Sequence, residues 1–197
     1  MDSKLWKCAS DGKEHIAEQL SRTKSLPYAV ALYLTAHGIE QKDVDSYFNA
    51  TFNDLSDPFR FPNMQIAVER LWTAVKNRER ILIHGDYDTD GITVTALLSW
   101  VLENNGAIVS SFLPDRFDDG YGFTPDSLQK ALDGCGGTCG VLVTVDCGIN
   151  SAEAVATARA KGIDVIITDH HDPAEGLPEA LAIINPKVHD EVSDLRN

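Results

Sequence analysis

The pattern of apolar and polar positions divides the chain near residue 80. Before that point, apolar residues recur at helical spacing in residues 28–34, followed by Gly38, and again in residues 64–80. Beyond it, short continuous apolar runs alternate with helical stretches. The runs cover residues 81–83, 108–113, 141–145, 163–168 and 182–184, and the helices between them are expected at residues 91–104, 125–134 and 151–161.

These short runs predict strands that are buried on both faces. Strands of this kind that alternate with helices form parallel sheets covered on both sides. The predicted fold class is therefore α/β, a Rossmann-like, mainly parallel sheet with helices on both faces. Residues 1–25 are polar and weakly patterned, so we expect a loosely held lead-in there. We expect a small helical amino-terminal arm over residues 1–70 and the α/β domain over residues 71–197.

Composition and charge narrow the class of protein. With 197 residues, of which 43% are apolar, the chain can bury a proper core. Its four cysteines contain no CxxC pair, so neither a disulfide framework nor a structural zinc site is expected. Without a signal segment or membrane-length span, we expect a cytoplasmic protein with no membrane partner. The formal charge of −13 argues against binding nucleic acid over the whole surface.

Acidic and imidazole side chains follow three of the predicted strands. In parallel α/β sheets, ligands bind beyond the carboxyl ends of the strands, so we expect these side chains to lie close together. They are His84, Asp88 and Asp90 after the run at residues 81–83, Asp146 after residues 141–145, and His170 and His171 after residues 163–168.

A cluster of carboxylates predicts bound cations, because packed carboxylates repel one another unless a cation holds them. Oxygen and imidazole ligands without a nearby thiolate favour Mn²⁺ or Mg²⁺. Five or more ligands exceed what one such ion takes from protein. Two divalent cations about 3.5–4 Å apart, sharing a carboxylate, would suit hydrolysis of a phosphate ester or anhydride.

Each motif also has a plainer interpretation when it stands alone. The stretch from Asp86 to Gly91 resembles half of a calcium-binding EF-hand loop, but Leu97 stands where a bidentate glutamate is required. It also resembles a haloacid-dehalogenase-type phosphatase motif, although four residues separate the apolar run from Asp88. By itself, Asp146 could be a helix cap or turn residue.

The loop at residues 113–123 is a candidate substrate contact. Arg116 suits a phosphate, and Tyr121, between two glycines, offers a ring on which a base can stack. A tight structural turn with a buried tyrosine is an equal alternative from the spacing alone.

The motifs His84-x-x-x-Asp88-x-Asp90, Asp146-Cys147-Gly148 and Asp169-His170-His171, in this order, resemble the DHH phosphoesterase superfamily. The loop at residues 116–122 and the upstream segment with Asp57-Pro58, Met64 and Ala67 are similar to its RecJ branch, the bacterial single-strand-specific 5′-to-3′ DNA exonucleases. The similarity runs over residues 26–186.

This resemblance implies roles for individual residues. Metal ligands would be His84, Asp88, Asp90, Asp146 and His170. Among these, Asp146 would bridge two ions and so take part directly in catalysis. The same resemblance has His171 contact the scissile phosphate or assist the leaving group, and Arg116 hold a substrate phosphate. Asp86 need not be a direct ligand, and Asp169 can support the site by orienting a histidine.

The implied function is two-metal-ion hydrolysis of DNA phosphodiester bonds by a 5′-to-3′ single-stranded-DNA exonuclease of DNA repair and recombination. Expected partners are the 5′ end of single-stranded DNA, single-strand-binding protein and a helicase, with a monomeric enzyme. Alternatives are a DHH phosphodiesterase for short oligonucleotides, cyclic dinucleotides or pyrophosphate, and a non-catalytic replication scaffold of the same fold.

Family members add a further aspartate ligand, a DHHA1 domain and an oligonucleotide-binding-fold domain, none of which is visible before Asn197. We therefore expect the amino-terminal portion of a larger enzyme, weakly active or inactive by itself. In such an enzyme, much of the grip on DNA would come from the other domains, which makes the acidic charge acceptable.

Overall fold

The computed structural model describes residues 7–115, 122–188 and 192, and the chain divides into two compact units between Leu55 and Ser56. This division comes earlier than the boundary expected at residues 70/71. The reason is α4 (Met64–Asn77), whose apolar face packs with the strands of the second unit through Ala67 and Ala74.

The first unit is helical, as expected for the amino-terminal arm. It contains α1 (Glu14–Lys24), α2 (Tyr28–Ala36) and α3 (Val44–Asn49), followed by the 3-10 turn η1 (Phe52–Asp54). The expectation of a loosely held lead-in was wrong for residues 14–24, which form α1. This helix buries only Ala17 and Leu20, against Ala31 and Leu34 of α2, so its sequence carries a weak periodic signal.

The second unit is a five-stranded, entirely parallel sheet in the order β2-β1-β3-β4-β5. Its strands are β1 (Arg80–His84), β2 (Ile108–Phe112), β3 (Val141–Val145), β4 (Asp164–Thr168) and β5 (Ala182–Ile184). A 3-10 turn, η2 (Pro58–Arg60), precedes α4. The predicted fold class is confirmed, because every strand pairs in parallel and helices lie on both faces.

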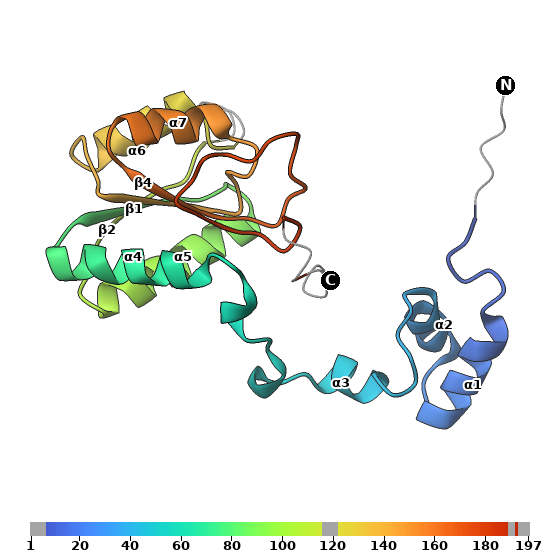
Figure 1. The fold of residues 1–197 in the computed structure, drawn as a ribbon. Helices are drawn as coiled ribbons and strands as arrows, with labels where there is room; N and C mark the ends of the chain where they lie inside the picture. Colours follow the sequence, from blue (N-terminus) through green and yellow to red (C-terminus); the bar gives the residue numbers. More distant parts are fainter. Residues whose placement is uncertain (1–6, 116–121, 189–191, 193–197) are drawn as a thin grey trace, which may run out of the picture. The chain divides into compact units, whose positions relative to one another are not determined.

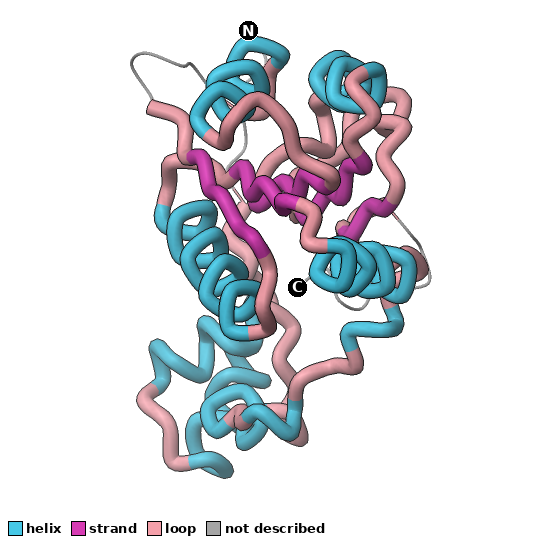
Figure 2. Tube along the Cα trace, turned by 90° about the vertical axis from the view of Figure 1, so that its left-hand side faces the viewer, coloured by secondary structure: helices cyan, strands magenta, loops and turns pink. Residues whose placement is uncertain are grey.

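The helices form two layers with the sheet between them. The helices α4 and α5 (Thr89–Asn104) cover one face, and α6 (Pro125–Gly134) and α7 (Ala152–Ala160) cover the other (Figure 1). A view turned by 90° shows the same sandwich (Figure 2). Each face has its own core: Leu82 and Leu142 point to the α6 and α7 side, whereas Ile81, Ile83 and Val143 point to the α4 side.

The strand order places a switch point between β1 and β3. From β1 the chain runs outward through α5 to β2, and then returns through α6 to β3 on the other side of β1. In open α/β sheets such a point leaves a crevice beyond the carboxyl ends of the two strands. The register puts His84 opposite Thr144, so the segments after β1 and β3 leave the sheet at the same level.

Among the residues that the structure describes, no helix has both the length and the apolar character needed to cross a bilayer.

Opposite the carboxyl edge, Arg70 of α4 joins three segments. Its Nε donates to Asp164 Oδ2 (2.6 Å), and its Nη2 donates to Glu79 Oε2 (2.5 Å) and to the carbonyl of Gly140 (3.2 Å). The side chain of Arg70 is only 17% exposed, so these contacts are shielded from water more than an ordinary surface pair.

We expect Arg70→Gln to lower the free energy of unfolding of the second unit by about 1–3 kcal/mol, because it removes charged hydrogen bonds to two carboxylates. Urea unfolding followed by tryptophan fluorescence would measure this, since Trp72 and Trp100 lie in this unit. The control is Arg159→Gln, which breaks the exposed pair with Glu179 and should change stability much less. Equal losses of unfolding free energy in the two variants would show that the Arg70 contacts stabilise the fold no more than an exposed ion pair does.

Candidate metal centre

The turn between β1 and α5 is built around the carboxylate of Asp88. Asp88 is the N-cap of α5, and its Oδ1 accepts hydrogen bonds from the backbone N–H groups of Asp90 and Gly91, each at 3.0 Å. Gly91 is required because a Cβ there would lie 2.4 Å from the carbonyl oxygen of Asp86. The close approach of helix and turn therefore fixes the position of the Asp88 side chain.

Asp146 follows β3 in an unusual backbone conformation. Its φ angle is +59°, in the left-handed region that aspartate tolerates better than most residues. Its N–H donates to the carbonyl of Thr168 at 2.9 Å, which continues the pairing of β3 with β4 for one residue. This bend turns the Asp146 side chain out of the strand direction, and strained backbone of this kind is often found at functional sites.

The carboxylate of Asp169, directly after β4, orients the residues that follow it. Its Oδ1 accepts the N–H groups of His170 (2.7 Å) and His171 (3.0 Å), and lies 2.7 Å from Nδ1 of the His171 ring. Its Oδ2 accepts the N–H of Ile149 at 3.0 Å. A proton on Nδ1 of His171, held by Asp169, leaves Nε2 with a free lone pair.

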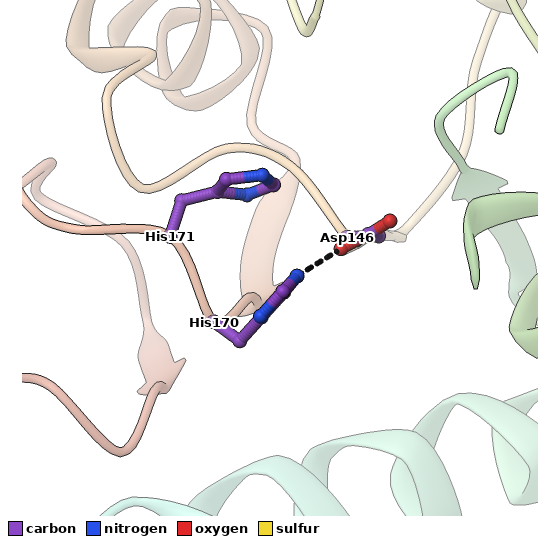
Figure 3. Close-up of side chains that lie close together, drawn as sticks. All are labelled: Asp146, His170 and His171. Atoms are coloured by element: carbon purple, nitrogen blue, oxygen red, sulfur yellow. Dashed lines mark ion pairs between the residues drawn. The ribbon is translucent and has the colours of Figure 1, made fainter. Parts of the chain in front are cut away.

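Asp146, His170 and His171 come together at the carboxyl edge of the sheet (Figure 3). Each offers one ligand atom, and these atoms lie within 4.8 Å of one another. Nε2 of His170 lies 3.0 Å from Oδ1 of Asp146, and the two imidazole rings are tilted against each other with centroids 4.7 Å apart. Groups of this type at this spacing fit a divalent cation.

Asp88 joins this group through Asp146, since the two carboxyls lie close enough to share a hydrogen bond. Burial raises the pKa of Asp146, and the negative charge of Asp88 raises it further. The pKa of Asp88 is instead lowered, first of all by the N–H of Gly91. A divalent cation bound at this pair would offset the repulsion between the two carboxylates.

Two further predicted aspartates lie beside the group. Asp90 lines a shallow hollow of about 270 Å³ together with Asp146 and His170. Asp86 is only 3% exposed, accepts the N–H of Tyr87 at 2.7 Å, and acts electrostatically on His171. Asp90 therefore shares a hollow with two of the grouped residues, whereas Asp86 is buried near His171.

His84 was predicted as a ligand, but it lies beneath the group and is fully buried. Its Nε2 lies 3.0 Å from Oγ of Ser127 on α6, and its Nδ1 lies 3.9 Å from Sγ of Cys147. The structure therefore brings Asp88, Asp90, Asp146, His170 and His171 to one place, with His84 turned toward α6.

A cavity of about 500 Å³ opens beside Asp146 and His171. Its walls include residues 122–125 at the start of α6 and residues 147–154 at the start of α7. Arg116 and Tyr121, the predicted substrate contacts, lie outside the described residues.

Sequence reasoning missed two residues that shape these surroundings. The side chain of Asn150 joins two loops by donating to the carbonyl of Asp172 (3.1 Å) and accepting from the N–H of Ala174 (2.7 Å). Ser127 was not considered. Its only sequence signal is its place three residues after the N-cap Thr124, as in a capping box.

The Asp169–His171 pair generates a prediction for the metal-free protein. Burial of the ring lowers the pKa of His171, but the hydrogen bond and charge of Asp169 outweigh it, so the pKa lies above its ordinary value. In Asp169→Asn the pKa of His171 should therefore fall, measured by NMR titration of the imidazole C–H signals. His37, whose ring contacts the carbonyl of Tyr33 in the first unit, serves as the internal control. An unchanged His171 titration would show that Asp169 does not control this ring.

The comparisons with known proteins agree with this geometry. A family model described as "DHH family, N-terminal domain" matches residues 80–194. The single-stranded-DNA-specific exonuclease RecJ of Bacillus subtilis is 35% identical over 178 residues, which are 90% of this chain and 22% of that protein. The protein of the same name from Escherichia coli is 44% identical over 125 residues, which are 63% of this chain and 21% of that protein.

Solved structures give the same result. Exonuclease RecJ bound to manganese matches with a TM-score of 0.62 and 32% identity, over 69% of this chain and 34% of that chain. RecJ from Thermus thermophilus in complex with Mn²⁺ matches with a TM-score of 0.64 and 25% identity, over 89% of this chain and 24% of that chain. This chain thus spans only about a fifth of the length of its curated relatives.

The family model covers more than half of the chain and includes every described residue of the candidate metal centre. The resemblance inferred from the sequence motifs is therefore confirmed: the chain belongs to the DHH family and contains its N-terminal domain.

Proposed function

We propose that this chain is the amino-terminal portion of a metal-dependent exonuclease that degrades single-stranded DNA in the 5′-to-3′ direction, in DNA repair and recombination. The observation that carries the proposal is the convergence of Asp88, Asp146, His170 and His171 at the switch point of a DHH-family sheet. The names of the relatives, single-stranded-DNA-specific exonucleases, support the substrate.

The proposed ligands of two divalent cations, Mn²⁺ or Mg²⁺, are Asp88, Asp90, Asp146 and His170, with Asp146 between the two ions. Two observations support this choice of ligands. Asp90, Asp146 and His170 line one hollow, and Asp88 shares a hydrogen bond with Asp146. The manganese in the titles of the two matching RecJ structures supports the kind of metal. When bound, the cations would activate water and stabilise charge on the phosphoryl oxygens.

The proposed roles of the chain's own groups follow from their positions. His171 lines the cavity, and its Nε2 could donate to a phosphate oxygen or to the leaving group when protonated. Asp169 holds that ring in one orientation, and buried Asp86 adds negative charge behind it. For Arg116 and Tyr121 we keep the proposal of a phosphate contact and a stacking surface, respectively.

The proposal extends to the wider setting of the enzyme. We propose a monomeric cytoplasmic enzyme that works with single-strand-binding protein and a helicase, both of which would supply accessible single strands. A substrate panel with 5′-phosphorylated single-stranded DNA, a cyclic dinucleotide and pyrophosphate distinguishes this enzyme from other phosphodiesterases of the family.

The full-length parent protein should degrade single-stranded DNA from an accessible 5′ end only when Mn²⁺ or Mg²⁺ is present. Asp146→Asn should lower the rate roughly 100-fold or more, because the shared ligand for both cations is lost. The 197-residue chain should be weakly active or inactive under the same conditions. A full rate in Asp146→Asn, or activity that survives chelation by EDTA, would refute the mechanism.

Metal binding should also appear in thermal stability. Since the folded-state pKa of Asp146 lies above its ordinary value, ionisation of this carboxyl as the pH rises past that value destabilises the metal-free fold. A saturating cation removes the repulsion, and Mn²⁺ at 100 times its Kd would add about 2.7 kcal/mol, or very roughly 5–10 °C in Tm.

At pH 7 and without metal, the Asp146→Asn variant should therefore have a Tm equal to or higher than that of the wild type. Adding Mn²⁺ should no longer raise its Tm. Differential scanning fluorimetry with and without Mn²⁺ measures both effects. Asp126→Asn, which changes an acidic residue in the first turn of α6, is the matched control and should keep the full response. A normal Mn²⁺ response in Asp146→Asn would exclude this carboxyl as a ligand.

A further inference from the structure

The side chain of His84 is enclosed by other side chains of the second unit. Its side chain stands at the carboxyl end of β1 and is fully buried. The ring of Phe112 lies 5.2 Å from it, centroid to centroid, and the ring of Phe123 meets it edge-on at 5.0 Å. An imidazole this deeply enclosed must have partners for its nitrogens, because an unpaired buried polar group is costly.

The partners of Ser127 determine how the His84 ring is used. Oγ of Ser127 accepts the N–H of Thr124 (2.9 Å), lies 3.1 Å from the carbonyl of Thr124, and lies 3.0 Å from Nε2 of His84. A hydroxyl has one proton to donate and two lone pairs. All three contacts are satisfied together when Ser127 donates to the carbonyl and His84 donates from Nε2.

This arrangement leaves Nδ1 of His84 as an acceptor, and the thiol of Cys147 lies 3.9 Å from it. The same sulfur lies 3.8 Å from the carbonyl oxygen of His84. Both nitrogens of the ring therefore face protein groups. To bind a cation, His84 would have to give up one of these contacts.

The contact with Ser127 reaches the wall of the cavity beside Asp146 and His171. Ser127 and Thr124 form a reciprocal cap, since the N–H of Ser127 also donates to Oγ1 of Thr124 at 3.1 Å. Residues 122–125, which include Phe123 and the Thr124 half of this cap, line the cavity. His84 is thus the link between the end of β1 and the segment that forms one side of the cavity.

We propose that His84 is a positioning residue, which acts through Ser127 to fix residues 122–125 as one wall of the substrate cavity, and that it is not a metal ligand. This proposal rests on the proposed function, which makes this cavity the place where the substrate binds. Loss of the His84 side chain should therefore weaken substrate binding. Loss of Asp146 or His170 should instead weaken cation binding.

Three variants test this proposal. Glutamine can place a side-chain N–H near the position of Nε2, whereas asparagine reaches only the position of Nδ1. His84→Gln should therefore keep the hydrogen bond to Ser127, and His84→Asn should lose it. Ser127→Ala removes the same bond from the other side without changing β1, so it remains informative if His84→Asn does not fold.

Two measurements on the 197-residue chain separate positioning from ligation. Hydrogen exchange of the backbone amides in residues 122–124 and 126–128 should accelerate about 3- to 10-fold in His84→Asn, as expected for the loss of one neutral hydrogen bond. It should accelerate at least as much in Ser127→Ala, which also loses the contacts of the hydroxyl with Thr124. The Kd for Mn²⁺ alone, measured by calorimetry, should stay within about twofold of wild type in both variants. His84→Gln should resemble wild type in both measurements.

Kinetics of the full-length parent on a short 5′-phosphorylated single strand complete the test. His84→Asn and Ser127→Ala should raise KM by about 3- to 10-fold with kcat nearly unchanged, and His84→Gln should restore KM.

The proposal is overturned if His84→Asn weakens Mn²⁺ binding tenfold or more while Ser127→Ala does not. It is also overturned if exchange at residues 122–128 and KM are unchanged in His84→Asn, or in Ser127→Ala should His84→Asn not fold. Failure of the proposed function looks different, because wild type would then bind Mn²⁺ no better than Asp146→Asn, and the exchange rates would still report on His84.

Discussion

Parallel pairing brings the carboxyl ends of β1, β3 and β4 to one level, and the candidate metal centre depends on this alignment. Val145 lies opposite Thr168 in the ladder, so Asp146 and the residues after β4 leave the sheet side by side. As a result, His170 reaches Asp146 at 3.0 Å. A slip of one residue would turn these side chains to the opposite face of the sheet and disperse the group.

Two buried carboxylates of the centre, Asp169 and Asp146, differ in whether the protein satisfies their charge. Asp169 is satisfied by four hydrogen bonds from the protein, so it needs no cation and serves to hold His171. Asp146 instead faces Asp88 and two imidazoles, and its pKa is raised by burial and by that neighbouring charge. The metal-free fold therefore stores unfavourable charge at one point, which links cation binding to stability.

Close backbone packing keeps these charged groups in place. Gly91 allows α5 to approach the turn at Asp86, and Gly148 allows the segment after β3 to pass Thr144, where a Cβ would lie 2.5 Å from Oγ1. Beneath them, buried His84 ties the end of β1 to the start of α6. The turns that carry the charged groups and the start of α6 are thus held by different contacts.

The sequence alone determined the parallel α/β sheet, its covering helices and the convergence of acids and histidines, because apolar runs and strand-end motifs are local signals and parallel pairing brings strand ends together. It missed α1, which buries only Ala17 and Leu20. The two compact units divide between Leu55 and Ser56, whereas the sequence placed the domain boundary at residues 70/71. Only the tertiary structure decided the setting of His84, since Ser127 and Cys147 approach it from 43 and 63 residues away. Packing between distant segments sets the partners of the two ring nitrogens. The spacing of residues within the motif cannot predict that packing.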